Sequence, residues 1–169
     1  MADGTLAEDD RFELIGGEIV PMSPRGIAHE AVRTELSRYW FKALPDETAG
    51  IPNTTLHLGE RDFLEPDFVF WPRALGIRGL TPSVVQLLVE ISDSSLEYDL
   101  GRKAAIYAGL GLPDYWVIDA RKLTVRIHRE PQDGAFRSVS DLAHTDLLTP
   151  LLLPALAVRL ADLGLSPEV

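Results

Sequence analysis

The sequence predicts an α/β protein in which a central mixed β-sheet is flanked by helices. Two observations support this fold class: strand-like stretches alternate with two helical stretches, and one central stretch is apolar on both faces. Because a strand inside a sheet is buried on both faces, the apolar stretch within residues 83–92 is expected in the middle of the sheet. The mixed sheet is therefore the predicted core of the protein.

The boundaries of the expected elements follow from local turn and stop signals. Gly16 and Gly17 form a pair that permits the positive φ angles of a tight N-terminal β-hairpin. Pro45 ends the first long helix, and Gly109 and Gly111 end the second. In chain order we expect a hairpin over residues 11–24, a helix over 29–44, strands within 51–59, 64–72 and 83–92, a helix over 95–111, a second hairpin over 114–130, and a strand or short helix over 151–163.

Composition limits the class of protein. With 169 residues, 46% of them hydrophobic, and no linker-like segment, the chain suits a single domain over residues 1–169. The lack of Cys excludes disulfides, thiolate zinc sites and cysteine nucleophiles, and it favours a cytoplasmic protein. The acidic residues before about Arg11 do not resemble a signal peptide and are expected to be disordered. Pro150 and Pro154 break the longest apolar stretch, so no membrane span is expected.

The charge of the chain bears on nucleic-acid binding. The formal net charge is -10, and loose electrostatic attachment to nucleic acid requires a basic surface instead. Only residues 121–137 are locally basic, with five basic side chains against two acidic ones. A narrow patch there could position a nucleic-acid backbone beside a metal site.

Two carboxylates interrupt apolar strands. Asp67 is expected on the same strand face as Val69 and Trp71, and Glu90 lies near the end of the next strand. If the two strands pair, the carboxylates meet, repel each other and need a shared proton or a cation. Mg²⁺ prefers such oxygen ligands, so Glu90 is a candidate metal ligand. In the alternative interpretation, Glu90 ends its strand and forms hydrogen bonds to the serines of the next turn, Ser92, Ser94 and Ser95.

A family resemblance covers almost the whole chain. The stretches "FELIGGEIVPMSP", "AHEAV" at the start of a helix, "EPDFVFW", and "LLVEISDSSLEYDLGRKAAIYAGLGLPDYWVID" followed by "TVRIHRE" resemble the Uma-two family of bacterial proteins. That family is similar to the PD-(D/E)XK nucleases. The resemblance implies a restriction-endonuclease-like fold and a DNA endonuclease that depends on Mg²⁺ or Mn²⁺.

The resemblance also implies roles for individual residues. Asp67 matches the motif aspartate, Glu90 matches the motif acid, and Ile91 would lend a backbone carbonyl to the metal. Ser92 stands where the superfamily has a lysine, and the nearby lysine is Lys103 on the following helix. The resemblance therefore implies that Lys103 takes the role of the superfamily's lysine.

The spacing around Lys103 allows two interpretations. Asp99, Lys103 and Tyr107 recur at intervals of four and share one helix face, which is expected to lean over the end of the preceding strand. A cation there could orient or deprotonate the attacking water and neutralise negative charge on the reacting phosphate. In the alternative interpretation, Lys103 only forms a helix-surface pair with Asp99, worth a few tenths of a kcal/mol.

Glu13 and His29 are further candidate catalytic residues. Glu13 resembles the extra N-terminal acid that many of these nucleases bring to the site, and the alternative is a solvent-facing strand residue. His29, at the start of a helix, could contact a phosphate or move a proton, and the alternative is a structural role.

The function that the sequence favours is hydrolysis of phosphodiester bonds. We expect DNA to be bound weakly and in a metal-dependent way, and a homodimer would let two sites cut two strands. Another phosphodiester substrate is not separated from DNA by the sequence. The alternative from a different class is a non-catalytic interaction protein that keeps the nuclease fold, which the acidic charge favours.

Overall fold

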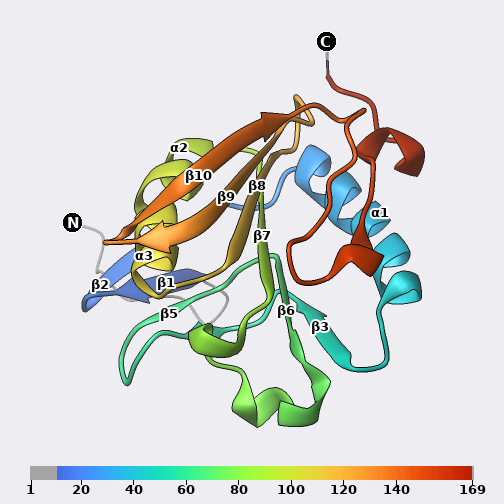
Figure 1. Cartoon of the computed structure of the whole chain (residues 1–169). Helices are drawn as coiled ribbons and strands as arrows, with labels where there is room; N and C mark the ends of the chain where they lie inside the picture. Colours follow the sequence, from blue (N-terminus) through green and yellow to red (C-terminus); the bar gives the residue numbers. More distant parts are fainter. Residues whose placement is uncertain (1–10, 169) are drawn as a thin grey trace, which may run out of the picture.

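A six-stranded mixed sheet forms the centre of the computed structural model, which describes residues 11–168 (Figure 1). Residues 1–10, where we expected disorder, lie outside the described residues. Strands β7 and β8 run parallel, and the other neighbours in this sheet are antiparallel. Its order is β10-β9-β8-β7-β6-β3, formed by Ala135–Leu142, Val125–Gln132, Asp114–Asp119, Leu87–Ser92, Phe68–Pro72 and Thr48–Pro52. The predicted α/β class with a mixed sheet is confirmed.

A second, four-stranded sheet lies beside the first and contains the expected N-terminal hairpin. The hairpin turns at Gly16 and Gly17, whose φ angles of 60° and 79° favour glycine. The order of this sheet is β2-β1-β5-β4, formed by Glu18–Pro21, Phe12–Ile15, Phe63–Leu64 and Leu56–His57. The hairpin extends toward one end of the central strands (Figure 1).

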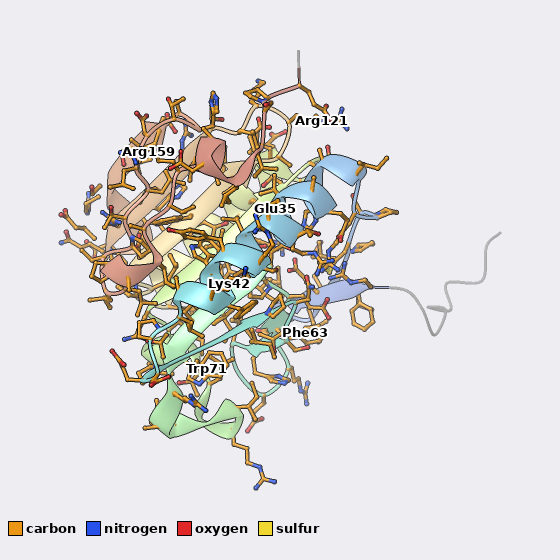
Figure 2. All side chains as sticks on the ribbon, turned by 90° about the vertical axis from the view of Figure 1, so that its right-hand side faces the viewer. Glu35, Lys42, Phe63, Trp71, Arg121 and Arg159 are labelled. Atoms are coloured by element: carbon orange, nitrogen blue, oxygen red, sulfur yellow. The ribbon has the colours of Figure 1, made fainter. Side chains whose placement is uncertain are left out.

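Helices cover the two faces of the six-stranded sheet. Helix α1, Ile27–Ala43, crosses one face and turns Glu35 and Lys42 outward (Figure 2). The other face carries a continuous helical segment made of α2, Leu96–Tyr98, a π-helical turn, Asp99–Lys103, and α3, Ala104–Gly109. The fold is therefore a sheet between two helical layers.

Successive side chains of a strand point to opposite faces of the sheet. The strands therefore contribute to two separate apolar cores, one on each face. The core under α1 contains Trp40 together with Phe68, Phe70 and Trp116. The core under α3 contains, among others, Val69, Trp71, Leu88, Tyr107 and Val117. The next position of β7 on this second face is Glu90, so a carboxylate takes the place of an apolar side chain there.

Several boundaries differ from the predicted ones. The stretch expected as one strand over 51–59 is divided between β3 and β4, and Pro66 separates β5 from β6 within 64–72. The stretch 83–92 begins as a 3₁₀ turn, Pro82–Val84, before β7. Strand β10 was not predicted, because most of its side chains are exposed and half of them are polar. The closing stretch forms short 3₁₀ helices, Pro154–Leu156 and Leu160–Leu163.

Across residues 11–168, no helix has both the length and the apolar character needed to cross a membrane.

Trp40 connects the layers and provides a test of the packing. It is fully buried, its ring centroid lies 5.1 Å from that of Phe68, and its Nε1 donates to the carbonyl oxygen of Leu156 at 2.9 Å. We expect Trp40→Ala to lower the free energy of unfolding by about 3–5 kcal/mol. Phe41→Ala, at a neighbouring side chain that is 40% exposed, should cost much less in the same urea titration. Equal costs would contradict this packing.

Candidate active site

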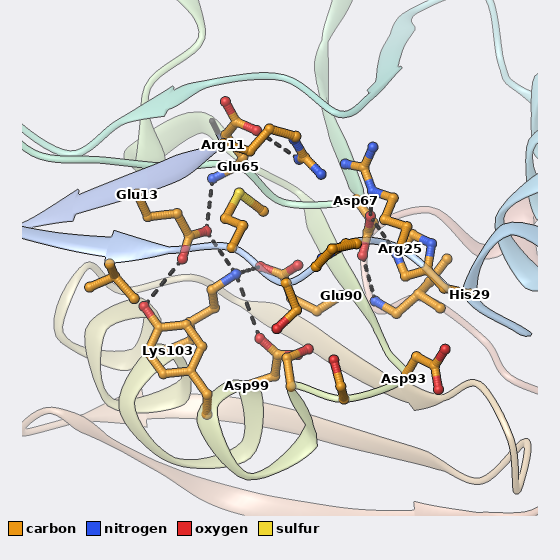
Figure 3. Close-up of a pocket in the computed structure, with 18 of the residues that line it drawn as sticks. Arg11, Glu13, Arg25, His29, Glu65, Asp67, Glu90, Asp93, Asp99 and Lys103 are labelled. Atoms are coloured by element: carbon orange, nitrogen blue, oxygen red, sulfur yellow. Dashed lines mark hydrogen bonds and ion pairs between the residues drawn. The ribbon is translucent and has the colours of Figure 1, made fainter. Parts of the chain in front are cut away.

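The site is a cavity of about 240 Å³ between the N-terminal hairpin, the start of α1 and the helical segment 96–109 (Figure 3). It lies on the α3 side of the ends of β6 and β7. The structure brings all the residues that the sequence singled out for chemistry to this one cavity: Glu13, His29, Asp67, Glu90, Ile91 and Lys103.

The strand register places Asp67 opposite Glu90. Phe68 pairs with Val89, and one further step in the same antiparallel register brings Asp67 across from Glu90. Both residues are buried, at 5% and 3% exposure. Like charges opposite each other on adjacent strands destabilise a sheet. The pair is therefore expected to cost stability when both carboxylates are charged.

Asp67 is fixed by donors on both oxygens. His29 Nε2 lies 2.9 Å from Oδ1, and the backbone N–H of Ile91 donates to Oδ2 at 2.8 Å. Arg25 Nε is 3.8 Å from Oδ1. One ring nitrogen of His29 therefore contacts Asp67.

Glu90 receives two hydrogen bonds on a single oxygen. Lys103 Nζ and the Tyr107 hydroxyl each donate to Oε1 at 3.0 Å. Burial raises the pKa of Glu90 well above its ordinary value, attraction to Lys103 opposes this rise, and the charges of Asp99, Asp67 and Glu13 add to it. The serines of the next turn do not hold Glu90, because Ser92 and Ser95 donate to Asp99 Oδ2, each at 2.6 Å.

Lys103 is buried among three carboxylates and does not form a surface pair with Asp99. Its Nζ lies 2.8 Å from Glu13, 3.0 Å from Glu90 and 3.6 Å from Asp99, and its exposure is 4%. Burial acts to lower the pKa of Lys103, but the three carboxylates outweigh it and raise the pKa above its ordinary value. The interpretation of Lys103 as a helix-surface residue is therefore wrong.

A π-helical turn holds Lys103 in this position. The turn spans Asp99–Lys103 and adds a residue to the usual helical repeat, and turns of this kind occur frequently at functional sites. It directs Lys103 inward, while Arg102 points out to Glu18. No feature of the sequence predicts this turn.

Glu13 is the most buried of the site's carboxylates, at 1% exposure. Its Oε1 accepts the backbone N–H of Glu65 at 3.1 Å, and its Oε2 accepts the hydroxyl of Tyr98 at 3.2 Å. Burial, and next the charge of Glu13, raise the pKa of Tyr98, so its hydroxyl remains a donor. The alternative of a solvent-facing strand residue is wrong for Glu13.

Sequence reasoning missed the arginines of the cavity. Arg11 comes from the start of the hairpin and Arg25 from the loop before α1. A loop arginine carries no periodic signal, and only the three-dimensional neighbourhood of Asp67 identifies Arg25.

The expected basic patch over residues 121–137 is largely neutralised. Each of its arginines lies within 3.4 Å of a carboxylate, in the pairs Arg121–Asp93, Arg126–Asp141, Arg129–Asp114 and Arg137–Asp133. The local surplus of basic residues does not form an unpaired cationic surface, so the prediction that this patch positions a nucleic-acid backbone is not supported by the contacts.

Two carboxylates of the cavity, Asp67 and Glu90, could serve as oxygen ligands of a cation such as Mg²⁺. Within residues 11–168, no group of three or more His, Cys, Asp or Glu side chains is arranged to hold a metal ion. Mg²⁺ commonly uses one or two carboxylates and completes its shell with water and substrate phosphate. Asp67 and Glu90 line one cavity, and both hydrogen bonds of Glu90 use Oε1, which leaves Oε2 for a cation.

The buried ammonium group provides a test of the network. Lys103→Met should lower the free energy of unfolding of the metal-free protein by about 3–5 kcal/mol, because it leaves buried carboxylates without their cation. Adding Glu90→Gln to this variant should recover part of the loss, since one buried charge is then gone. Urea unfolding followed by circular dichroism measures both effects.

The matched control is the adjacent basic residue. Arg102 is exposed, so Arg102→Met should change stability far less than Lys103→Met does. Similar losses for the Arg102 and Lys103 variants would show that the buried network does not hold the fold together.

Comparisons with known proteins identify a shared fold and a family. A crystal structure described as a "putative nuclease belonging to DUF820" from Anabaena variabilis superimposes with a TM-score of 0.75 at 17% identity, covering 94% of this chain and 92% of that one. The likeness shows a shared fold and supports the expected restriction-endonuclease-like architecture. No curated protein matches the chain. The profile of the Uma2 family, described as "Putative restriction endonuclease", matches residues 3–162, and the chain belongs to this family.

Proposed function

We propose that the protein is a Mg²⁺-dependent DNA endonuclease whose metal is held by Asp67, Glu90 and the backbone carbonyl of Ile91. The observation that carries this proposal is the meeting of two buried carboxylates in opposite register beside a buried lysine, with Lys103 Nζ 3.0 Å from Glu90. Such a set is costly for folding and suited to phosphodiester hydrolysis. Mn²⁺, which also accepts oxygen ligands, is expected to replace Mg²⁺.

Mg²⁺, when bound, would supply Lewis-acid charge and lower the pKa of a coordinated water. The chain's own groups supply orientation. Lys103 carries a fixed positive charge beside Glu90, which suits it to orient the attacking water and to stabilise negative charge on the phosphate oxygens. Glu13 and Asp99 hold its ammonium group in place. His29 holds Asp67 through Nε2.

The alternative is a non-catalytic interaction protein that retains the nuclease fold. The formal net charge of -10 and the paired arginines over residues 121–137 favour this alternative, because neither attracts nucleic acid. The buried acidic pair favours catalysis. Weak, metal-dependent DNA binding and assembly as a homodimer remain part of the proposal.

Cleavage of DNA is the direct test. The wild-type protein should nick or cut plasmid and short duplex DNA only when Mg²⁺ or Mn²⁺ is present. Asp67→Asn and Glu90→Gln keep the side-chain shape and should each lower the rate by at least about a hundredfold, because charge stabilisation at the phosphate is lost. Asp67→Ala and Glu90→Ala should abolish it.

Glu35→Gln is the matched control for this assay. Glu35 lies on the outer side of α1 and pairs with Arg38, so the substitution should leave cleavage unchanged. If the Asp67 and Glu90 variants retained full activity, the cleavage would come from a contaminant. Absence of cleavage by the wild type with either metal and each DNA form would favour the interaction protein.

Thermal melting tests the metal site without a substrate. At about a hundred times its dissociation constant, a cation that binds only the folded state stabilises it by roughly 2.7 kcal/mol. For a domain of this size the melting temperature should rise by about 5–10 °C with Mn²⁺. Asp67→Asn and Glu90→Gln should lose this rise, and a wild type indifferent to the metal would refute the ligand assignment.

Without metal, the same two substitutions should change the stability of the protein in opposite directions. Because the folded pKa of Glu90 is raised, the wild type loses stability as pH rises above the unfolded value near 4.5. Glu90→Gln avoids this loss, so it should melt at or above the wild type at pH 7, with a smaller difference near pH 4.5. Asp67→Asn should instead be destabilised by about 1–3 kcal/mol, because an amide does not satisfy both donors of Asp67. A Glu90→Gln variant less stable than the wild type at pH 7 would assign Glu90 a structural role.

A further inference from the structure

Arg25 has a donor that the fold leaves unused. Its Nε faces Asp67 Oδ1 at 3.8 Å, beyond hydrogen-bonding distance. Its Nη2 is buried and has no hydrogen-bond partner among residues 11–168. Buried polar groups in folded proteins are nearly always paired, so an unpaired guanidinium nitrogen calls for a missing acceptor.

A second guanidinium lies on the same side of the cavity. Figure 3 shows Arg11 and Arg25 extending toward each other above Asp67. Burial lowers the pKa of Arg25 from its ordinary value, and the next contribution is the charge of Arg11. Two like charges brought together in a partly buried place repel each other. An anion between or beside them would relieve this repulsion.

The carboxylates near the two arginines are already engaged. Glu65 accepts from Arg11 Nη2 at 2.8 Å. Asp67 is bound by His29 and by the N–H of Ile91, and in the proposed function it also serves a cation. Glu30, which lies nearer the surface, pairs with Arg33. None of these carboxylates lies within hydrogen-bonding distance of Arg25 Nη2.

The same cavity separates charge into two regions. Lys103 lies among Glu13, Glu90 and Asp99, so its positive charge belongs to the acidic region of the cavity. Arg11 and Arg25 line the opposite side, next to Asp67. The planar guanidinium fork matches the geometry of phosphate oxygens, which accept two parallel N–H donors.

We propose that Arg25, assisted by Arg11, forms a phosphate subsite that binds a backbone phosphate group of the substrate next to Asp67 and Glu90. The identification of that phosphate with nucleic acid rests on the proposed function. The subsite explains how a chain with a net charge of -10 holds an anionic substrate: the attraction is confined to one side of the cavity and needs no basic outer surface.

The test uses the side-chain Nε–Hε NMR signals of arginine in isotope-labelled full-length protein. Inorganic phosphate and the dinucleotide dTpdT are titrated separately, each in metal-free buffer and with Ca²⁺. The Arg25 and Arg11 signals should shift together and saturate, while the signal of Arg38, on the outer side of α1, should not follow them. The only phosphate group of dTpdT is a phosphodiester. Its binding therefore distinguishes a site for a nucleic-acid backbone from a site that binds only free phosphate.

Substitutions of Arg25 then test whether this residue forms the phosphate subsite. Arg25→Gln should weaken binding of both probes by at least about tenfold, because a charge-assisted hydrogen bond is lost. Arg25→Lys should retain part of the affinity, and Arg38→Gln should retain all of it. In the absence of probe, Arg25→Gln should keep the wild-type melting temperature within about 2 °C, since its Nη2 holds nothing in the fold.

The outcomes separate this inference from the proposed function. Equal affinity of the wild type and Arg25→Gln, with and without Ca²⁺, would overturn the subsite even if the protein cuts DNA. Saturable Arg25-dependent binding would establish it even if Ca²⁺ has no effect and no DNA is cut. Binding of inorganic phosphate but not of dTpdT would overturn the assignment to a nucleic-acid backbone.

Discussion

The structure of the site depends on one buried ammonium group facing three carboxylates. One positive charge does not compensate Glu13, Glu90 and Asp99 together, so the network favours a proton or a second cation. Burial is the main cause of the raised pKa of Glu90, and the charges of the neighbouring carboxylates add to it. A divalent cation at Asp67 and Glu90 would meet the same deficit with two positive charges. In the proposed function, a proton and a metal would compete for the same carboxylates, and metal affinity should fall as the pH is lowered.

The backbone holds these charged side chains at defined positions. The antiparallel register of β6 and β7 places Asp67 across from Glu90, and the parallel neighbour β8 buries the other side of β7 within the sheet. Asp67 also accepts the N–H of Ile91, so its carboxylate is fixed by the strand that carries Glu90. The π-helical turn then directs Lys103 to the same strand end. Each of the three positions is set by a different element, and none can move without changing its distance from the others.

Sequence reasoning predicted the sheet and the acidic pair because both leave a local signal. A carboxylate such as Glu90 within an apolar strand stands out, and the turn at Gly16-Gly17 is a short-range feature. The surroundings of Lys103 could not be predicted, since a residue four positions after Asp99 has the same pattern in a surface pair and in a buried network. Strand β10 was missed because its polar residues are held by pairing with β9 and not by burial. Arg25 lies in a loop, where no periodicity indicates which way a side chain points.

The position of the positive charges would reconcile an acidic protein with the proposed anionic substrate. Arginines on the outer strands are paired with carboxylates and add little to the field away from the surface. Arg25, Arg11 and the proposed cation would instead be gathered in one cavity, where each charge acts at short range. Attraction confined in this way does not draw in nucleic acid from a distance, so the protein should bind its substrate slowly and locally compared with a basic nuclease. Selectivity would then depend on which phosphate can enter the cavity, and the acidic exterior would act against non-specific binding along the duplex.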